Sequence, residues 1–384
     1  MRFSRVSMAL LLSTALIPPA LAQSDKEFVP EKVTVQERIN PGPNVFVLDQ
    51  SWNGASSLNV LSADDLSTKG NMSIGLVSQV TMSPDRKTAY FASIYPERIM
   101  RGPVHATLEE FDVDTLTVRR EIPLLDKMAE VSPSDSLLTL SADGAFMFVA
   151  NATPASSVSV VDLSAGAIVS EVPIPGCWSM YPTTEGAGFT TLCGDGTLQT
   201  VTIGADGSAA KTTKSEKIFD PDTDPLFIQG VRAGNDLIFM SFNGNIYRIA
   251  DGEEAPILVD KYSIVDGIDG SWAPGGVEIM AYNKAHDVLF VTMHSDAAEG
   301  SHKDPATEVW AITLADKTVQ YRSVVSGVAS IAVTGGDKPV LFGANDEDGV
   351  VTRYDVDPEA KFAAKLTETA EDVGSFIPLV IAEP

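Results

Sequence analysis

SADGAFMFVAN, residues 141–151, joins a turn that contains Asp and Gly to a short apolar strand. SPDRKTAYFAS, residues 83–93, is a second clear copy of this turn-and-strand unit. Weaker copies occupy residues 42–50, 183–193, 232–242, 283–293 and 335–345. The seven copies start roughly 40 to 58 residues apart, which indicates an internal structural repeat.

Several copies are followed by a hairpin in which Asp, Gly or Asn supplies the turn. Clear examples are EEFDVDTLTVRREIP, VSVVDLSAGAIVSEVP, EVWAITLADKTVQYR and VTRYDVDPEAKFAAKL, which begin at residues 109, 158, 308 and 351. Four strands at this period are typical of a propeller blade, and no long helical periodicity follows the N-terminal segment. We therefore expect an all-β fold, a seven-bladed β-propeller of four-stranded antiparallel blades over residues 44–384. An array of β-sandwiches would need linkers between its units, and none is visible.

The first 22 residues have the pattern of a secretory signal peptide. Arg2 and Arg5 precede an apolar run over residues 8–17, and Ala20-Leu21-Ala22 forms a cleavage site. No later stretch approaches the roughly 18 apolar residues of a membrane span. Export through a cleavable signal predicts a periplasmic protein, and residues 23–43, which are polar and charged, are expected to form an N-terminal arm.

Charge excludes two classes of partner. The formal net charge is −25, and it becomes −27 when Arg2 and Arg5 leave with the signal peptide. A chain this acidic repels nucleic acid and anionic lipid, so we expect neither a nucleic-acid nor a membrane partner.

The only two cysteines, Cys177 and Cys193, stand at the two ends of a strand–turn–strand pattern. An exported protein meets an oxidising compartment, so we expect one disulfide that closes this hairpin. In the chain-entropy model a loop of this size contributes roughly 3 kcal/mol to stability.

Catalytic motifs are missing from the sequence. The four histidines are His105, His286, His294 and His302. The first two stand alone near charged turns, and the spacing of the other two in MHSDAAEGSHKD matches no zinc pattern. DPDTD (220–224) and NDEDG (345–349) resemble the start of a calcium loop, but the first lacks the later glycine and glutamate and the second is explained as a turn. We expect no metal and no catalytic residue on this chain.

Six segments, in order along most of the chain, resemble the heavy subunit of quinoprotein amine dehydrogenases, the methylamine and aromatic amine dehydrogenases. The disulfide hairpin is one of them, since it reads Cys-aromatic, Tyr181-Pro182-Thr183 and then Cys193-Gly-Asp-Gly. The six are RIMRGPVHATLEEFDVDTL (98–116), GCWSMYPTTEGAGFTTLCGDG (176–196), FDPDTDPLF (219–227), SFNGNIYRI (241–249), GSWAPGGVEIMAYNKAHDVLFV (270–291) and EGSHKDPATEVW (299–310).

The resemblance implies that the catalytic cofactor is carried by a separate subunit. Such a heavy subunit is a propeller without a cofactor, and a small cysteine-rich light subunit carries tryptophan tryptophylquinone. The implied assembly is a heterotetramer of two heavy and two light chains. It oxidises primary amines to aldehyde and ammonia and passes electrons to an amicyanin- or azurin-like copper protein. Neither the preferred amine nor the electron acceptor follows from the sequence.

The resemblance also suggests the residues that contact the light subunit at the mouth of the substrate channel. The family's channel phenylalanine aligns near Asn53, and we expect its neighbour Trp52 to take that role. Tyr95 is the second candidate aromatic. Arg98 and Arg101 stand out in an acidic chain and are expected either to bind carboxylates of the partner or to form local salt bridges.

Two functions from other classes remain open. A periplasmic propeller can serve as a binding scaffold without any amine-oxidising partner. A propeller hydrolase or lactonase would need a central calcium ion or an acid/base set, which the scarcity of histidine disfavours.

Overall fold

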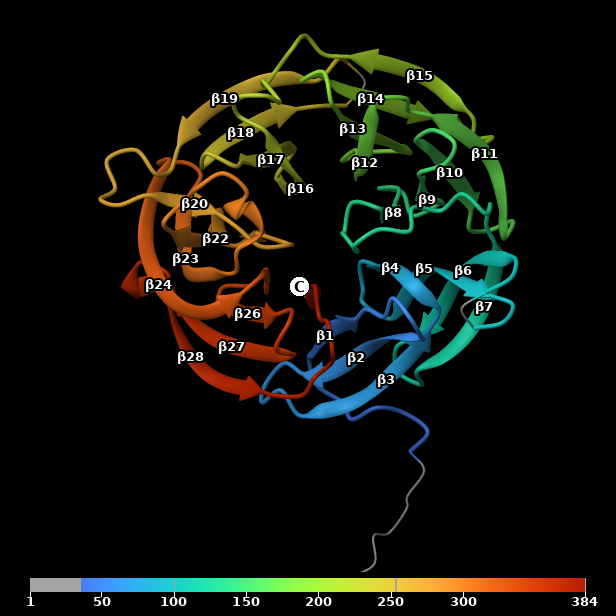
Figure 1. Ribbon diagram of the computed structural model, residues 1–384, viewed down its shortest axis with the longest axis horizontal. Helices are drawn as coiled ribbons and strands as arrows, with labels where there is room; N and C mark the ends of the chain where they lie inside the picture. Colours follow the sequence, from blue (N-terminus) through green and yellow to red (C-terminus); the bar gives the residue numbers. More distant parts are fainter. Residues whose placement is uncertain (1–35, 100, 253, 384) are drawn as a thin grey trace, which may run out of the picture. The chain divides into compact units, whose positions relative to one another are not determined.

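Seven antiparallel sheets are arranged as the blades of a ring in the computed structural model (Figure 1). The structure describes residues 36–99, 101–252 and 254–383, and the ring belongs to the unit of residues 38–384. The expected signal peptide and most of the expected arm lie outside the described residues. The seven-bladed β-propeller predicted from the repeats is confirmed.

Each blade runs from an innermost strand at the axis to an outermost strand at the rim. Blade 1 contains β29 (Leu379–Ala382), β1 (Asn44–Asp49), β2 (Ser56–Ser62) and β3 (Thr68–Ile74). Blade 2 contains β4 (Leu76–Met82), β5 (Thr88–Pro96), β6 (Val104–Asp112) and β7 (Thr117–Pro123). Blade 3 contains β8 (Leu138–Leu140), β9 (Phe146–Asn151), β10 (Ser157–Asp162) and β11 (Ala167–Pro173). Blade 4 contains β12 (Cys177–Pro182), β13 (Gly188–Cys193), β14 (Leu198–Ile203) and β15 (Ala209–Lys214).

The remaining three blades continue the same order. Blade 5 contains β16 (Leu226–Ala233), β17 (Asp236–Ser241), β18 (Asn245–Ala250) and β19 (Ile257–Ser263). Blade 6 contains β20 (Trp272–Pro274), β21 (Met280–Asn283), β22 (Val288–Ser295), β23 (Ala306–Thr313) and β24 (Thr318–Val328), with the 3-10 helix η1 (Ser301–Lys303) between β22 and β23. Blade 7 contains β25 (Ser330–Val333), β26 (Val340–Asn345), β27 (Val350–Asp357) and β28 (Ala363–Ala370), with η2 (Pro358–Ala360) before β28.

The repeated apolar strands of the sequence are the second strands of the blades. A second strand packs against the neighbouring blade on each side, so its side chains are buried on both faces and it reads as a continuous apolar run. All six residues of β9 are buried, whereas in the outer strand β11 exposed positions alternate with partly buried ones and with buried Val172. Buried clusters accordingly occupy each of the seven junctions between neighbouring blades.

The turn in the repeat is closed by its own side chains. The hydroxyl of Ser141 donates to Asp143 Oδ1 at 2.6 Å, and the amides of Ala145 and Phe146 donate back to Asp143 and Ser141. Ser83 and Asp85 make the equivalent hydrogen bond in blade 2, at 2.7 Å. The S-x-D pattern therefore specifies the turn between the first and second strands.

The ring closes through pairing between the two ends of the propeller. β29 pairs antiparallel with β1, with Leu48 opposite Leu379 and Val45 opposite Ala382. The first blade is thus built from both ends of the propeller, and this pairing closes the ring.

The inner edge of blade 6 is interrupted. β20 and β21 both pair with β22, and Pro274-Gly275-Gly276 separates them. Gly276 has φ +127°, and a Cβ at Gly275 would lie 2.5 Å from the carbonyl oxygen of Asp304. The chain bends tightly here, and a Cβ atom would not fit at either glycine.

Candidate functional site

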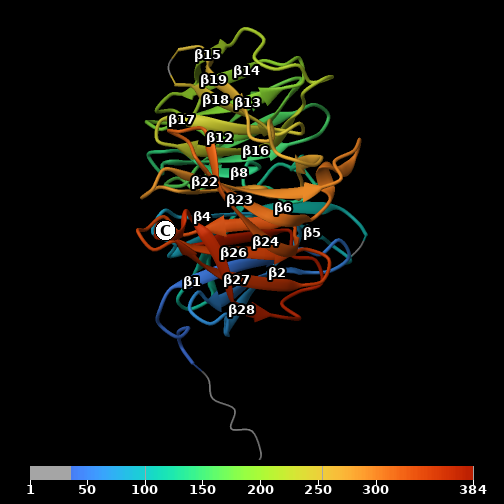
Figure 2. The same cartoon turned by 90° about the vertical axis from the view of Figure 1, so that its left-hand side faces the viewer.

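Two loops from neighbouring blades bring the predicted channel residues to one end of the ring, which we call the long-loop face. We define it by the loops between the second and third strands of each blade and by the connections between blades. Its longest second-to-third-strand loops cover residues 97–103 in blade 2 and 296–305 in blade 6, and both project from the same side in Figure 2.

Trp52 and Tyr95 both lie on the long-loop face. Trp52, in the loop between β1 and β2, is 48% exposed, and Asn53 beside it is also exposed. Tyr95 is near the end of β5 and is 38% exposed. A small pocket of about 290 Å³ between these loops is lined by Gly54 and Ala55 on one side and by Tyr95, Pro96 and Ile99 on the other. The structure therefore brings together the two loops that the sequence analysis selected.

Arg98 and Arg101 lie in the loop between β5 and β6 and are exposed. The amide of Arg98 donates to the carbonyl of Arg101 at 2.9 Å, which holds the two residues in a tight turn. Among the described residues, neither guanidinium forms an ion pair. Both are thus able to bind carboxylates of another molecule.

A buried carboxyl group forms a hydrogen bond with Tyr95. The Tyr95 hydroxyl donates to Glu109 Oε1 at 2.7 Å. Glu109 is 4% exposed, and its burial raises the pKa of the carboxyl group. Burial, followed by this hydrogen bond, raises the pKa of the Tyr95 hydroxyl too. Glu109 was not predicted from the sequence, although two consecutive glutamates in a strand, as in TLEEFD, point to opposite faces.

The predicted disulfide is confirmed. Cys177, the first residue of β12, lies directly opposite Cys193, the last residue of β13, and the two sulfurs are bonded. Met180, Tyr181 and Phe189 are buried in the same blade, as expected for core residues. The bridge therefore holds the first hairpin of blade 4 together at the long-loop face.

The candidate metal-binding histidines serve other purposes. His294 is 3% exposed, and its Nδ1 lies 3.0 Å from the carbonyl oxygen of Ser295. His302 stacks on Phe242 with the ring centroids 4.3 Å apart. Over residues 36–99, 101–252 and 254–383, no group of three or more His, Cys, Asp or Glu side chains could hold a metal ion.

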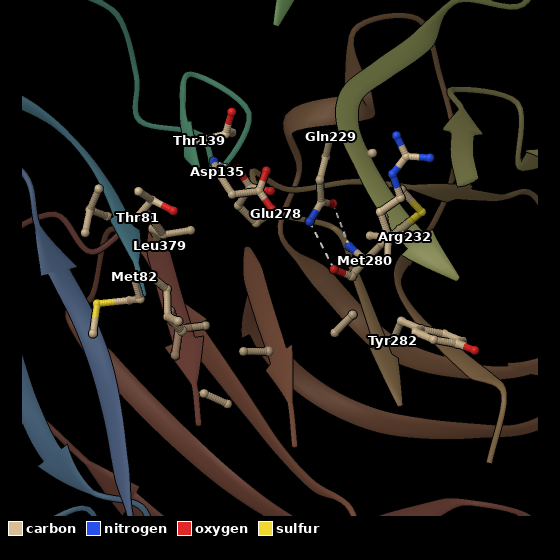
Figure 3. Close-up of a pocket in the computed structure, with 18 of the residues that line it drawn as sticks. Thr81, Met82, Asp135, Thr139, Gln229, Arg232, Glu278, Met280, Tyr282 and Leu379 are labelled. Carbon is tan, nitrogen blue, oxygen red and sulfur yellow. Dashed lines mark hydrogen bonds between the residues drawn. The ribbon is translucent and has the colours of Figure 1, made fainter. Parts of the chain in front are cut away.

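A cavity at the axis of the ring contains acidic groups that the sequence analysis did not select. It encloses about 590 Å³ and is lined by residues of the innermost strands and their turns. Asp135, in the connection between β7 and β8, meets Glu278, which immediately precedes Ile279 and β21 (Figure 3). The Asp135 amide donates to Glu278 Oε1 at 3.1 Å. Asp135 in PSDS has the sequence pattern of an ordinary turn, so only the ring geometry reveals the pair.

The two carboxyl groups are hard to ionise together. Burial raises the pKa of Glu278 well above its ordinary value, and the charge of Asp135 raises it further. Asp135 is exposed to the axial cavity, and its partial removal from bulk water inside the ring raises the pKa to about 7. Near neutral pH the pair therefore carries less than two full negative charges.

Comparison with known proteins identifies the family of this chain. The family described as methylamine dehydrogenase heavy chain (MADH) matches residues 41–373. The chain belongs to the methylamine dehydrogenase heavy-chain family. The match covers blades 2 to 7 in full and β1, β2 and β3 of blade 1, and it ends before β29.

Relatives within the methylamine dehydrogenase heavy-chain family are distant in sequence. The methylamine dehydrogenase heavy chain of Methylophilus methylotrophus is 24% identical over 366 residues, which cover 91% of this chain and 88% of the relative. The heavy chain of Methylorubrum extorquens is 26% identical over 324 residues, covering 82% of this chain and 77% of the relative.

Solved structures establish the fold alone. The periplasmic gluconolactonase of Pseudomonas aeruginosa superposes with a TM-score of 0.63 at 16% identity, covering 89% of this chain and 99% of that chain. A putative 6-phosphogluconolactonase from Bacteroides fragilis gives a TM-score of 0.62 at 11% identity, covering 91% of this chain and 99% of that chain. Within the part of the chain that the structure describes, no helix is long and apolar enough to cross a membrane.

Proposed function

We propose that this chain is the heavy subunit of a periplasmic quinoprotein amine dehydrogenase and carries no catalytic group of its own. The observation that carries the proposal is the match to the methylamine dehydrogenase heavy-chain family over residues 41–373. In the proposed complex a small cysteine-rich light subunit carries tryptophan tryptophylquinone, and two heavy chains combine with two light chains.

The proposed reaction converts a primary amine and water to an aldehyde and ammonia, with release of two electrons and two protons. The quinone on the light subunit would accept the electrons, and an amicyanin- or azurin-like copper protein would receive them one at a time. The amine's carbon chain requires an apolar passage to the quinone, and an aromatic wall supplies such a surface while it excludes water.

The long-loop face is the surface that we assign to the light subunit. Trp52 and Tyr95 offer exposed aromatic area, which is enriched at protein interfaces, and exposed Ile99 extends this apolar surface. Arg98 and Arg101 lie in the loop that follows Tyr95, where they can bind carboxylates of the partner. The long-loop face thus combines apolar anchors with cationic groups in an otherwise acidic chain.

Coexpression tests this function directly. The full chain should copurify with a small cysteine-rich subunit, and the complex should reduce a redox dye only when a primary amine is added. Copurification without amine-dependent reduction would contradict the enzymatic proposal, and recovery of the chain alone would favour a binding scaffold.

Substitution of the two arginines tests the proposed face. We expect Arg98→Ala/Arg101→Ala to weaken association with the light subunit by roughly tenfold or more, because each arginine loses a charge-assisted hydrogen bond. Arg38→Ala is the matched control, since Arg38 is an exposed arginine already paired with Asp114 at 3.2 Å. Equal affinities for the two variants would place the light subunit elsewhere.

A further inference from the structure

The axial cavity combines largely apolar walls, interrupted by polar side chains such as Thr81, Ser141 and Gln229, with an acidic floor. Its walls come from the innermost strands and include the apolar side chains of Val80, Leu140, Val231, Ile331 and Leu379. Its volume of about 590 Å³ is within the range of small-molecule sites. The carboxyl groups of Asp135 and Glu278 provide the acidic floor.

The floor is a loop that reaches across the ring. Asp135 belongs to the connection into blade 3 and Glu278 to blade 6, and two blades separate them on one side and three on the other. Contact between them is therefore made across the axis. Gln79 Oε1 of blade 2 accepts the amide of Ser134 at 3.1 Å, and the carbonyl of Ser136 accepts the amide of Met180 in blade 4 at 2.8 Å. Bonds to three blades hold the loop that positions Asp135.

The carboxyl groups on the floor lack a full set of partners in the described part of the chain. Glu278 is 2% exposed, yet its Oε2 has no hydrogen-bond partner among the described residues. Neither Glu278 nor Asp135 takes part in an ion pair within that same part of the chain. Thr139, which is 6% exposed, also lines the cavity with a hydroxyl that has no partner there. Buried polar atoms are normally satisfied, so these atoms point to a ligand.

Two arginines, Arg86 and Arg232, also line the cavity, and the buried Nε of Arg86 has no hydrogen-bond partner among the described residues. Arg232 is near the far end of β16, and its guanidinium binds Asp251 and the carbonyl of Pro182. Arg86 lies in the turn after β4, at the opposite end of the strand from the connection that carries Asp135. Both are therefore separated from the acidic floor along the strand direction.

The chemistry of the lining decides between two classes of cation. Calcium takes six to eight oxygen ligands, whereas the described residues place no third carboxylate or histidine with this pair. A primary ammonium ion needs only a few acceptors, and its carbon chain would contact the apolar walls. We propose that the axial cavity binds a small alkylammonium ion, with its nitrogen on Asp135 and Glu278. The reduced charge of the pair near neutral pH matches a single positive charge.

This site is distinct from the proposed channel mouth and does not depend on the quinone-bearing subunit. Trp52 and Tyr95 do not line the axial cavity. The test therefore uses the full chain without a light subunit, and failure of one proposal leaves the other standing.

The experiment titrates the full chain with n-butylammonium chloride near pH 7.5 and measures the heat of binding by calorimetry. We expect saturable binding with one site per chain. Asp135→Asn and Glu278→Gln should each weaken it by roughly tenfold or more, because each replaces a carboxyl group that shares the negative charge of the pair by a neutral amide. Glu368→Gln, an exposed glutamate on the outer strand β28, is the matched control and should bind normally. Folding of every variant is checked by circular dichroism.

Competing ligands make the result specific. We expect 1-butanol and butyrate to give no binding, because the first lacks the charge and the second has the wrong sign. Absence of butylammonium binding, or unchanged binding by Asp135→Asn and Glu278→Gln, would overturn the proposal. Displacement of butylammonium by calcium at lower concentration would assign the cavity to a metal ion instead.

Discussion

Trp52 is the residue whose substitution best separates function from stability. Its side chain is 48% exposed, so little packing is lost on truncation. We expect Trp52→Ala to change KM and the preference among amines in the reconstituted complex while the thermal midpoint of the isolated chain stays within about 2 °C.

The control for Trp52 is Tyr321→Ala on the outer strand β24, where the side chain is 43% exposed. This substitution removes a similar exposed aromatic far from the long-loop face and should leave the kinetics unchanged. Steady-state kinetics with a short and a long amine measure the difference. Unaltered kinetics for Trp52→Ala would refute its placement at the channel mouth.

Asp135 should make stability depend on pH. Its pKa is raised from 3.8 to about 7, so the folded chain retains a proton that the unfolded chain releases. The contribution of the protonated Asp135 carboxyl group to the free energy of unfolding is fully present below about pH 4. It is lost as the pH rises through about 7. The groups that face Asp135 are Glu278 and the hydroxyl of Tyr181, and both pKa values are also raised by burial.

Urea unfolding at several pH values measures this effect. As the pH rises from about 5 to about 8, we expect the free energy of unfolding of the wild type to fall relative to that of Asp135→Asn. Glu368→Gln should run parallel to the wild type over the same range. Parallel curves for Asp135→Asn would show that the pKa of Asp135 is not raised in the folded chain.

At the scale of elements, the hairpin β12–β13 depends on a single covalent link. Cys177 and Cys193 are paired residues in the register, separated by 16 positions, so the bridge closes a short loop in the unfolded chain. We expect Cys177→Ser/Cys193→Ser to lower the free energy of unfolding by roughly 3 kcal/mol.

Reductant provides an internal check for the disulfide. These are the only cysteines, so a reducing agent should lower the free energy of unfolding of the wild type to that of the double variant. The double variant itself should not respond to the reducing agent. Denaturant titration with and without reductant measures both effects. A double variant as stable as the oxidised wild type would mean that the strands alone maintain the hairpin.

The local signals for the strands have clear physical causes. Ser141 and Asp143 close their turn by side-chain hydrogen bonds, and the apolar run after them fills a doubly buried strand. Both causes act within about ten residues, so they are visible in the sequence. The tight bend at Pro274-Gly275-Gly276 also has a local cause, because glycine accepts backbone conformations that other residues avoid.

At the scale of the whole molecule, closure of the ring rests on four residues at its end. Leu379 and Val380 of β29 are each 3% exposed, and they pair with β1 at the other end of the propeller. Deletion of residues 379–384 should abolish the cooperative unfolding transition, because it exposes both neighbouring junctions and the inner edge of blade 1.

Near-ultraviolet circular dichroism and thermal unfolding measure the effect of this deletion. Removal of residues 383–384 alone is the control and should retain a cooperative transition. A cooperative, native-like spectrum after deletion of residues 379–384 would show that three strands suffice for blade 1.

The amino-acid sequence by itself determined the blade count, the turn positions and the disulfide, because each follows from neighbours in the chain or from the presence of just two cysteines. Tertiary structure alone decided which acidic residues meet at the axis and which end of the ring carries Trp52 and Tyr95. Asp135 and Glu278 are 143 residues apart and belong to opposite blades. Their contact depends on the radius of the closed ring, which no local pattern encodes.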